Sequence, residues 1–363
     1  MFSSRLDWSL EPNKLSALLK TRHHVLDLTE SNPTRAGFEY PAEKILAALS
    51  DARALRYEPD PRGLLSAREA VAEYYGDVPA SSILLTASTS EAYAYLFKLL
   101  CDPGDEILSP RPSYPLVEFL AGLESVRAIQ YPLRYDGAWH IDFDFLTRAI
   151  TPRTRAIVVV NPNNPTGSFL KREEWSRLEQ FGIPILADEV FSDYAFSPAP
   201  RPPSPSALRF SMSGLSKIAA LPQMKLGWIV AAGPGHEAAL ARLELIADTY
   251  LSVATPVQIA LPRLLAASVA VREQIITRTS ANLALLKSVT QPLHLEGGWY
   301  AILQVPRTRS EEDWALDLLA RRDVLVQPGF YYDFESEAFL VLSLLPPPEI
   351  FAEALRRLVE EIR

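Results

Sequence analysis

The strongest restriction on the fold is a repeated alternation of short apolar runs with amphipathic stretches. Helical periodicity predicts helices at Ser66–Tyr75 and Glu91–Leu100. The apolar runs predict buried strands at Glu106–Ser109, Ala156–Val160, Ile183–Ala187 and Gly227–Ala231. The intervals between these strands are long enough for the crossover helices that parallel strands require. The pattern therefore predicts an α/β fold, with a mostly parallel sheet covered by helices.

The pattern changes after about Leu240, which suggests a second, smaller domain. The segments that follow are a helix-rich stretch to Lys287, an alternating run (Gly298–Val305), a helix (Glu311–Arg321) and the strand-like run FLVLSLL. We expect residues 241–363 to form an α+β domain together with residues 1–40, and residues 41–240 to form the large domain.

The composition excludes several classes of protein. A net charge of −8 argues against a nucleic-acid partner and against a role at an anionic membrane surface. The chain has no run of apolar residues long enough to cross a membrane, and its first residues do not resemble a secretory signal. The single cysteine, Cys101, excludes an internal disulfide framework and favours a reducing cytoplasm. The five histidines lack metal-ligand spacing, so we expect no metal site.

Polar residues follow two of the predicted strands directly. Asn161 comes after a Val-Val-Val run, and Asp188 comes after Ile-Leu-Ala. Ligands of open parallel sheets bind at the carboxyl ends of the strands. We therefore expect the two side chains to lie on one edge of the sheet, where a ligand would bind.

Three motifs occur in a characteristic order: NPNNPTG (Asn161–Gly167), LADEV (Leu186–Val190) and SGLSK (Ser213–Lys217). Together they resemble the class I/II aminotransferases, which use pyridoxal 5′-phosphate (PLP), and the resemblance extends over nearly the whole chain. It implies a fold-type I, aspartate-aminotransferase-like structure. It also implies a transferase that exchanges an amino group between an amino acid and a 2-oxo acid, in a ping-pong reaction through pyridoxamine phosphate.

The resemblance assigns a role in cofactor chemistry to one residue of each motif. Lys217 would hold PLP as a Schiff base, the internal aldimine, and would then move a proton between the substrate Cα and the cofactor. Asp188 would pair with the pyridine nitrogen and keep it protonated. The amide of Asn164 would bind the 3′-oxygen of the cofactor.

The same resemblance supplies further contacts to the cofactor. Thr89 and Ser90, in a small-residue turn that opens a predicted helix, would bind the phosphate through a helix N-terminus. Lys225 would add positive charge near the phosphate, and Tyr114 would stack on the pyridine ring. Tyr57 matches a tyrosine that reaches the phosphate of the neighbouring subunit. This last match implies a homodimer with composite active sites.

Three positions depart from the family pattern. Lys225 stands where an arginine usually grips the phosphate, and Phe191 stands where a tyrosine usually donates a hydrogen bond to the 3′-oxygen. Val341 stands where an arginine usually binds the α-carboxylate of the substrate. Either Arg35, in a loop that matches the N-terminal loop of the family, replaces this arginine, or the substrate lacks an α-carboxylate at this point.

Two other functions stay open at this stage. A PLP-dependent lyase that eliminates a β-substituent would use every residue named above for the same Cα deprotonation. A non-catalytic PLP-binding protein would explain Val341 and Phe191 as remnants of lost chemistry.

Overall fold

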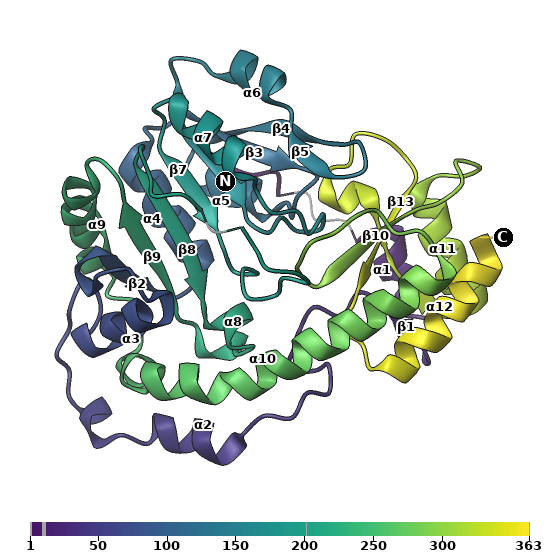
Figure 1. The fold of residues 1–363 in the computed structure, drawn as a ribbon, viewed down its shortest axis with the longest axis horizontal. Helices are drawn as coiled ribbons and strands as arrows, with labels where there is room; N and C mark the ends of the chain where they lie inside the picture. The colour runs from purple at the N-terminus through teal and green to yellow at the C-terminus, as the bar shows by residue number, and fades with distance from the viewer. Residues whose placement is uncertain (1, 9–11, 201, 363) are drawn as a thin grey trace.

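A computed structural model of the protein describes residues 2–8, 12–200 and 202–362, and its centre is a large mixed sheet (Figure 1). In spatial order the strands are β2 (Ile83–Thr86), β9 (Gly227–Ala232), β8 (Arg209–Gly214), β7 (Ile185–Asp188), β6 (Thr154–Val160), β3 (Glu106–Arg111), β4 (Arg127–Tyr135) and β5 (Trp139–Ile141). The five strands from β8 to β4 are parallel, which confirms the predicted α/β architecture.

The strand at Gly227–Ala232 runs against the direction expected for it. β9 is antiparallel to both β8 and β2. The connection from β8 to β9 holds only the short helix α8 (Leu215–Ile218) and the 3₁₀ turn η3 (Pro222–Met224). These elements do not form a long crossover helix, so the chain returns alongside β8 in the opposite direction.

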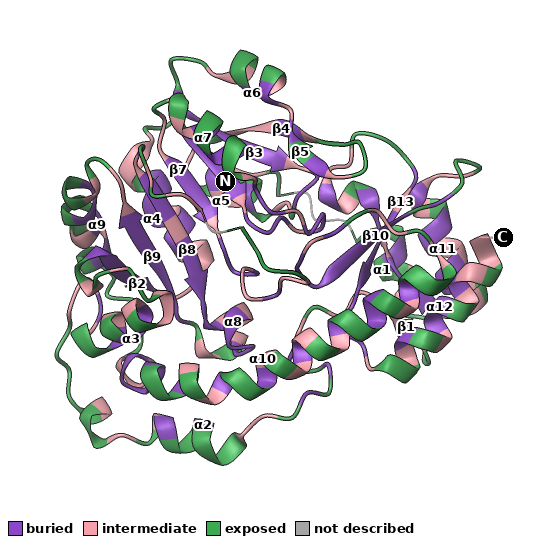
Figure 2. Cartoon of the chain, in the orientation of Figure 1, coloured by how far each residue is buried: buried purple, intermediate pink, exposed green. Residues whose placement is uncertain are grey.

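Helices cover both faces of this sheet because successive strand residues point to opposite sides. Leu84, Val158 and Leu186 pack against one layer, formed by α4 (Thr89–Leu100), α5 (Leu116–Leu123) and α9 (His236–Tyr250). Ile83, Leu85, Ile157 and Val159 face the other layer. That layer holds α2 (Ala42–Leu49), α3 (Leu65–Tyr75), α6 (Phe143–Ala149), α7 (Arg172–Gln180) and part of α10 (Thr255–Val289). The central strands are consequently buried on both sides (Figure 2).

A second, smaller core brings the two ends of the sequence together. β10 (Tyr300–Gln304), β13 (Phe339–Ser343) and β12 (Gln327–Pro328) form an antiparallel sheet, and β1 (Leu26–Asp27) pairs in parallel with β11 (Val324–Leu325). The remaining helices of this region are α1 (Lys14–Leu19), α11 (Glu311–Arg322) and α12 (Pro348–Ile362). The N-terminal strand is thus held by the C-terminal part of the chain.

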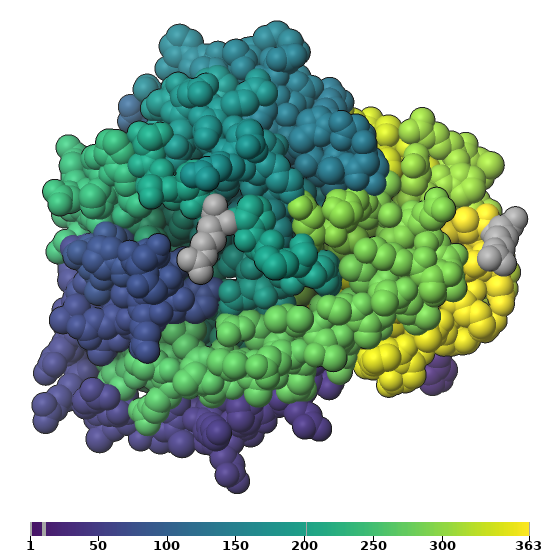
Figure 3. All heavy atoms as spheres, in the orientation of Figure 1, coloured from purple at the N-terminus to yellow at the C-terminus, as the bar shows by residue number. Residues whose placement is uncertain are grey.

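The long helix α10 connects the two cores. It packs against α2 and α3 at one end and against α12 at the other, and Figure 3 shows it crossing this face of the molecule in green. The predicted boundary at residue 240 falls within α9, which packs on α4 and β9 of the large sheet. In the described part of the chain, no helix combines the length and apolar character needed to span a membrane.

Candidate active site

The turn after β6 leaves one asparagine free for a ligand. The backbone N–H of Asn161 donates to the carbonyl of Asp188 at 2.8 Å, so the turn begins beside the end of β7. The Asn163 side chain holds the turn together by donating to the Thr166 hydroxyl at 2.9 Å. The Oδ1 atom of Asn164, by contrast, is buried and has no hydrogen-bond partner within the described residues. Because a buried polar atom without a partner is costly, Asn164 is suited to a ligand.

Gly167 joins this turn to the small domain. It has a φ of 66°, and a Cβ at this position would lie 2.4 Å from the carbonyl oxygen of Gly297. The backbone N–H groups of Glu296 and Gly297 both donate to the carbonyl of Gly167, at 3.0 and 2.9 Å. The contact needs a glycine, and it brings the loop before Trp299 close to the end of the sheet.

Asp188 ends β7 and is held by two donors. Its Oδ1 accepts from the backbone N–H of Val190 at 3.2 Å, and its Oδ2 accepts from the hydroxyl of Tyr93 at 3.1 Å. Burial raises the pKa of Asp188 to about 6, although both hydrogen bonds and the nearby Lys217 lower it. The carboxylate is therefore ionised at neutral pH and can pair with a protonated ring nitrogen.

Lys217 lies on α8 among aromatic side chains. Its Nζ is 4.9 Å from the centre of the Trp299 ring and 5.5 Å from the centre of the Phe191 ring. The hydroxyl of Tyr194 donates to the backbone carbonyl of Lys217 at 2.5 Å, which fixes the short helix. Burial lowers the pKa of Lys217 to about 8, and Asp188 opposes this shift. A sizeable fraction of this amine is thus a free base near neutral pH, as a nucleophile requires.

The start of α4 faces the closely packed ends of β8 and β9. Ser88 caps the helix by accepting from the N–H of Glu91, and the first-turn N–H groups of Thr89 and Ser90 lack partners within the helix. A Cβ on Gly227 would lie 3.0 Å from the Ser213 carbonyl oxygen and 3.1 Å from the Ser88 carbonyl carbon. The glycine therefore lets backbone from β9 lie against the helix start, as an anion cradle requires.

Two further residues lie near this cradle. The Oγ of Ser213 is another buried polar atom without a partner among the residues that the structure describes. Lys225 is exposed, adopts a left-handed φ of 48° and precedes Gly227 by two residues. Ser213 was not predicted from the sequence, although it begins the SGLSK motif.

A cluster of tyrosines lies beside the aromatic side chains that surround Lys217. Tyr114 is 53% exposed, and it lies near Tyr300 and Tyr332. The rings of Tyr300 and Tyr332 are 6.5 Å apart, and the N–H of Ser113 donates to the Tyr332 carbonyl at 2.9 Å. The sequence indicated Tyr114 only, because the other two come from distant segments.

Val341, at the position where the family usually has the carboxylate-binding arginine, is part of an apolar wall. Val341 is fully buried on β13 and belongs to one cluster with Phe191, Trp299, Tyr300 and Tyr332. Phe191 also packs edge-on against Trp299, with ring centres 5.2 Å apart. Val341 itself offers no cation to a substrate carboxylate, and the amine that lies over the wall is that of Lys217.

Arg35 lies in the N-terminal loop beside this wall. The hydroxyl of Ser343, two residues after Val341, donates to the Glu30 carbonyl at 2.6 Å and holds the loop along β13. The Arg35 side chain is 76% exposed, and its Nε is 3.8 Å from a Glu30 carboxylate oxygen. The guanidinium is thus within ion-pair distance of Glu30, and its exposed side would be accessible to a ligand at the edge of the wall.

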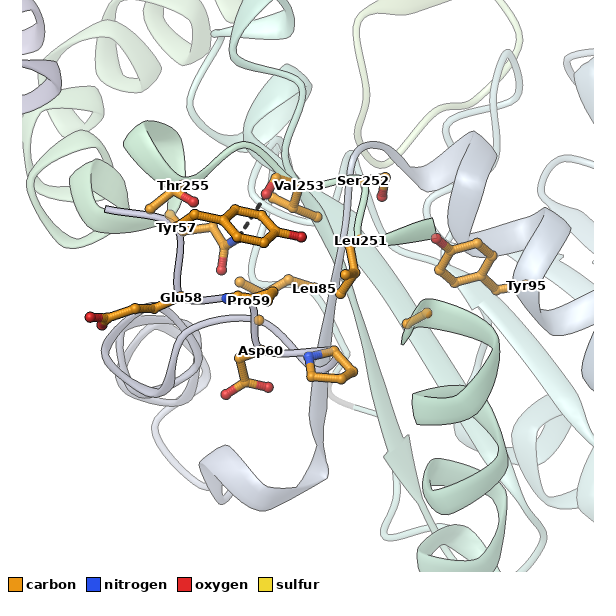
Figure 4. A pocket seen from close by; sticks show the side chains of 14 residues that line it. Tyr57, Glu58, Pro59, Asp60, Leu85, Tyr95, Leu251, Ser252, Val253 and Thr255 are labelled. Carbon is orange, nitrogen blue, oxygen red and sulfur yellow. Dashed lines mark hydrogen bonds between the residues drawn. The ribbon is translucent and has the colours of Figure 1, made fainter. Parts of the chain in front are cut away.

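Tyr57 lies in a surface pocket that excludes the residues of the three motifs (Figure 4). Its side chain is 78% exposed, and the pocket walls include Tyr95, Ser252 and Gln258. Such exposure suits contact with another subunit. The other predicted residues, from Thr89 to Lys217, gather around the carboxyl ends of the parallel strands.

The residues at this edge fit PLP. A buried amine, a buried carboxylate, two buried polar atoms without partners and a helix start with free N–H groups are the donor set that a phosphorylated pyridine aldehyde needs. Tyr93, which binds Asp188, was missed from the sequence. Only its place one turn after Thr89, on the sheet-facing side of the helix, could have indicated it.

Comparisons with known proteins agree with this chemistry. A family model described as aminotransferase class I and II matches residues 23–358. A glutamate-pyruvate aminotransferase of Escherichia coli K12 is 32% identical over 249 residues, which are 64% of this chain and 62% of that relative. The chain thus spans about 62% of the length of the first curated relatives that it matches. A glutamate-pyruvate aminotransferase of Haemophilus influenzae is 27% identical over 92% of this chain and 89% of its own. An Escherichia coli aminotransferase structure superimposes with a TM-score of 0.86 and 25% identity, covering 100% of this chain and 98% of that one.

Proposed function

Because this chain belongs to the class I and II aminotransferase family, whose members depend on PLP, we propose that it transfers amino groups between an amino acid and a 2-oxo acid. The observation that carries this proposal is the pairing of Lys217, with its pKa lowered to about 8, and Asp188 at the edge of the sheet. When bound, PLP would supply the electron sink for breaking a bond at the substrate Cα.

The chain would hold the cofactor and move protons. Lys217 would carry it covalently and act as the base and acid at the substrate Cα. Asp188 would keep the ring nitrogen protonated, and Asn164 would bind the 3′-oxygen. Thr89, Ser90 and Lys225 would bind the phosphate, and Tyr114 would cover the open face of the ring.

We propose that Arg35 binds the substrate carboxylate. The support is its position on a loop that Ser343 holds along β13, beside Val341, with a guanidinium that is mostly exposed. The relatives named as glutamate-pyruvate aminotransferases make glutamate and alanine the first amino donors to test.

We also propose a homodimer in the cytoplasm. Tyr57 supports the dimer, because its exposed ring lies apart from its own site and would reach the phosphate of a second subunit. Sedimentation with and without Tyr57→Ala, combined with measurement of PLP retention, tests this assembly.

The test of the main function is chemical labelling followed by product analysis. Borohydride reduction of the holoenzyme should place the pyridoxyl group on Lys217, as found by peptide mapping. Turnover with glutamate or alanine should yield the 2-oxo acid and the pyridoxamine form. Release of ammonia would instead favour the lyase alternative, and a label on another lysine would overturn the assignment of the site.

A further inference from the structure

The buried tyrosine beside Asp188 has a specific orientation. Tyr93 is 2% exposed, and its hydroxyl donates to Asp188 Oδ2 at 3.1 Å. Burial keeps the pKa of Tyr93 well above its ordinary value of 10.0, so the hydroxyl stays a donor at every working pH. The only other hydrogen bond to this carboxylate within the described structure comes from the backbone of Val190 to Oδ1.

The donor comes from the helix that also forms the phosphate cradle. Tyr93 lies one turn after Thr89 on α4, and its ring packs against Phe97 with centres 5.8 Å apart. One helix would therefore contribute to holding the cofactor in two places, at the phosphate directly and at the ring nitrogen through Asp188. The backbone bond from Val190 is local to the loop, whereas the bond from Tyr93 ties Asp188 to α4.

We propose that Tyr93 is a positioning residue, which holds the Asp188 carboxylate toward the ring nitrogen of the cofactor and keeps it ionised. The inference rests on the proposed role of Asp188. A hydrogen bond donated to a carboxylate favours its charged form, and removing the donor raises the carboxyl pKa. The charged and titratable groups that face Asp188 are Tyr93 from α4, Lys217 from α8 and the adjacent Glu189.

The test measures binding of pyridoxamine 5′-phosphate to the apoprotein by calorimetry between pH 5 and 8.5. This probe forms no covalent link to Lys217. In Tyr93→Phe we expect the Kd at pH 7.5 to rise about 10- to 100-fold, which is the value of a hydrogen bond to a charged group. The pH below which binding weakens, which is the acid limb of the profile, should also rise by about one unit.

The matched control is Tyr131→Phe. Tyr131 is 1% exposed, and its hydroxyl donates to the Val158 carbonyl at 2.9 Å, so this variant loses a comparable buried hydrogen bond that is not made to Asp188. We expect its melting temperature to fall while the Kd and the acid limb stay unchanged. A purely structural Tyr93 would behave in the same way.

A double-mutant cycle tests the role of Tyr93 separately from the role of Asp188. If Tyr93 acts through Asp188, then Tyr93→Phe should have no further effect on the Kd in an Asp188→Asn background. Additive effects, or a Tyr93→Phe profile within twofold of the wild type, would overturn the role of Tyr93 and leave the proposed function intact. If Asp188→Asn itself binds the probe normally, the assignment of Asp188 falls and the inference falls with it.

Discussion

The two halves of the candidate site differ in how closely they follow the family. The half built on the large sheet keeps the lysine, the aspartate and the asparagine, which lie on the short helix after β8, at the end of β7 and in the turn after β6. The half built on the small domain has Val341 in an apolar wall and Arg35 on an exposed loop. The residues that bind the cofactor must match the same cofactor atoms in every member of the family. The residues that bind the substrate can differ when the substrate differs.

The physical settings of the two halves explain this difference. On the large sheet, burial lowers the pKa of Lys217 and raises the pKa of Asp188, so it disfavours the charged form of both groups. The proximity of the two side chains opposes both shifts, because each charge stabilises the other. On the small domain, a carboxylate against Val341 would be buried without a cation, which is costly. Arg35, on the loop held along β13, would supply that cation from the edge of the wall.

The largest expected effect is at Lys217. Lys217→Ala should remove covalent PLP, and the loss of general acid–base catalysis alone should lower kcat by about 10²- to 10⁴-fold. Absorbance of the purified protein and steady-state kinetics measure both. Lys225→Ala serves as the control, since it should weaken cofactor retention but keep the covalent label. Substantial activity in Lys217→Ala would contradict the assignment.

Arg35→Ala tests the substrate half. It should lower kcat/KM for α-amino acids, and the loss should correspond to about 2–5 kcal/mol of transition-state stabilisation, the cost of removing one partner from a desolvated charge pair. PLP retention should change little. Arg22→Ala is the control, because this arginine pairs with Asp323 in the small domain, 3.5 Å away. Unchanged kcat/KM for every α-amino acid in Arg35→Ala would direct attention to amines without an α-carboxylate.

Cofactor uptake should depend on pH through the two shifted groups. The lowered pKa of Lys217, about 8, means that its free amine increases about tenfold per pH unit up to 8 and then levels off. The raised pKa of Asp188, about 6, means that the carboxylate becomes neutral below 6, and uptake should fall further there. Stopped-flow mixing of apoprotein with PLP measures the profile. In Asp188→Asn the upper inflection should move below pH 8, because Asp188 raises the pKa of Lys217. An inflection near pH 10.5 in the wild type would contradict the lowered pKa of Lys217.

The smallest expected effect concerns Phe191. This side chain is 4% exposed and packs on Trp299, near Lys217 Nζ, where a tyrosine would add a donor. In Phe191→Tyr, the pH midpoint of the visible-absorbance titration should fall by roughly one unit, because a donor to the 3′-oxygen stabilises its ionised form. Phe145→Tyr is the control, because this partly buried side chain packs in a different hydrophobic cluster. A midpoint that stays or rises would show that Phe191 does not occupy the proposed position.

The sequence predicted the elements that depend on local pattern. The helix at Ser66–Tyr75 is α3, the run at Ala156–Val160 is the core of β6, and the helix at Glu311–Arg321 is α11. Hydrophobic period and turn residues decide such elements within a few residues of chain. The same local signals placed Asn161 and Asp188 at strand ends, as the structure has them, and so indicated the candidate site.

By itself, the sequence determined the order of motifs, the α/β architecture and the residue types that suit PLP chemistry. Only the tertiary structure decided that β9 runs antiparallel, that Tyr93 binds Asp188, and that Tyr300 and Tyr332 meet Tyr114. These features join segments far apart in the chain, and no local pattern specifies which side chains meet across such distances. The charge states of Lys217 and Asp188 belong to the same class, because burial and proximity exist only after folding.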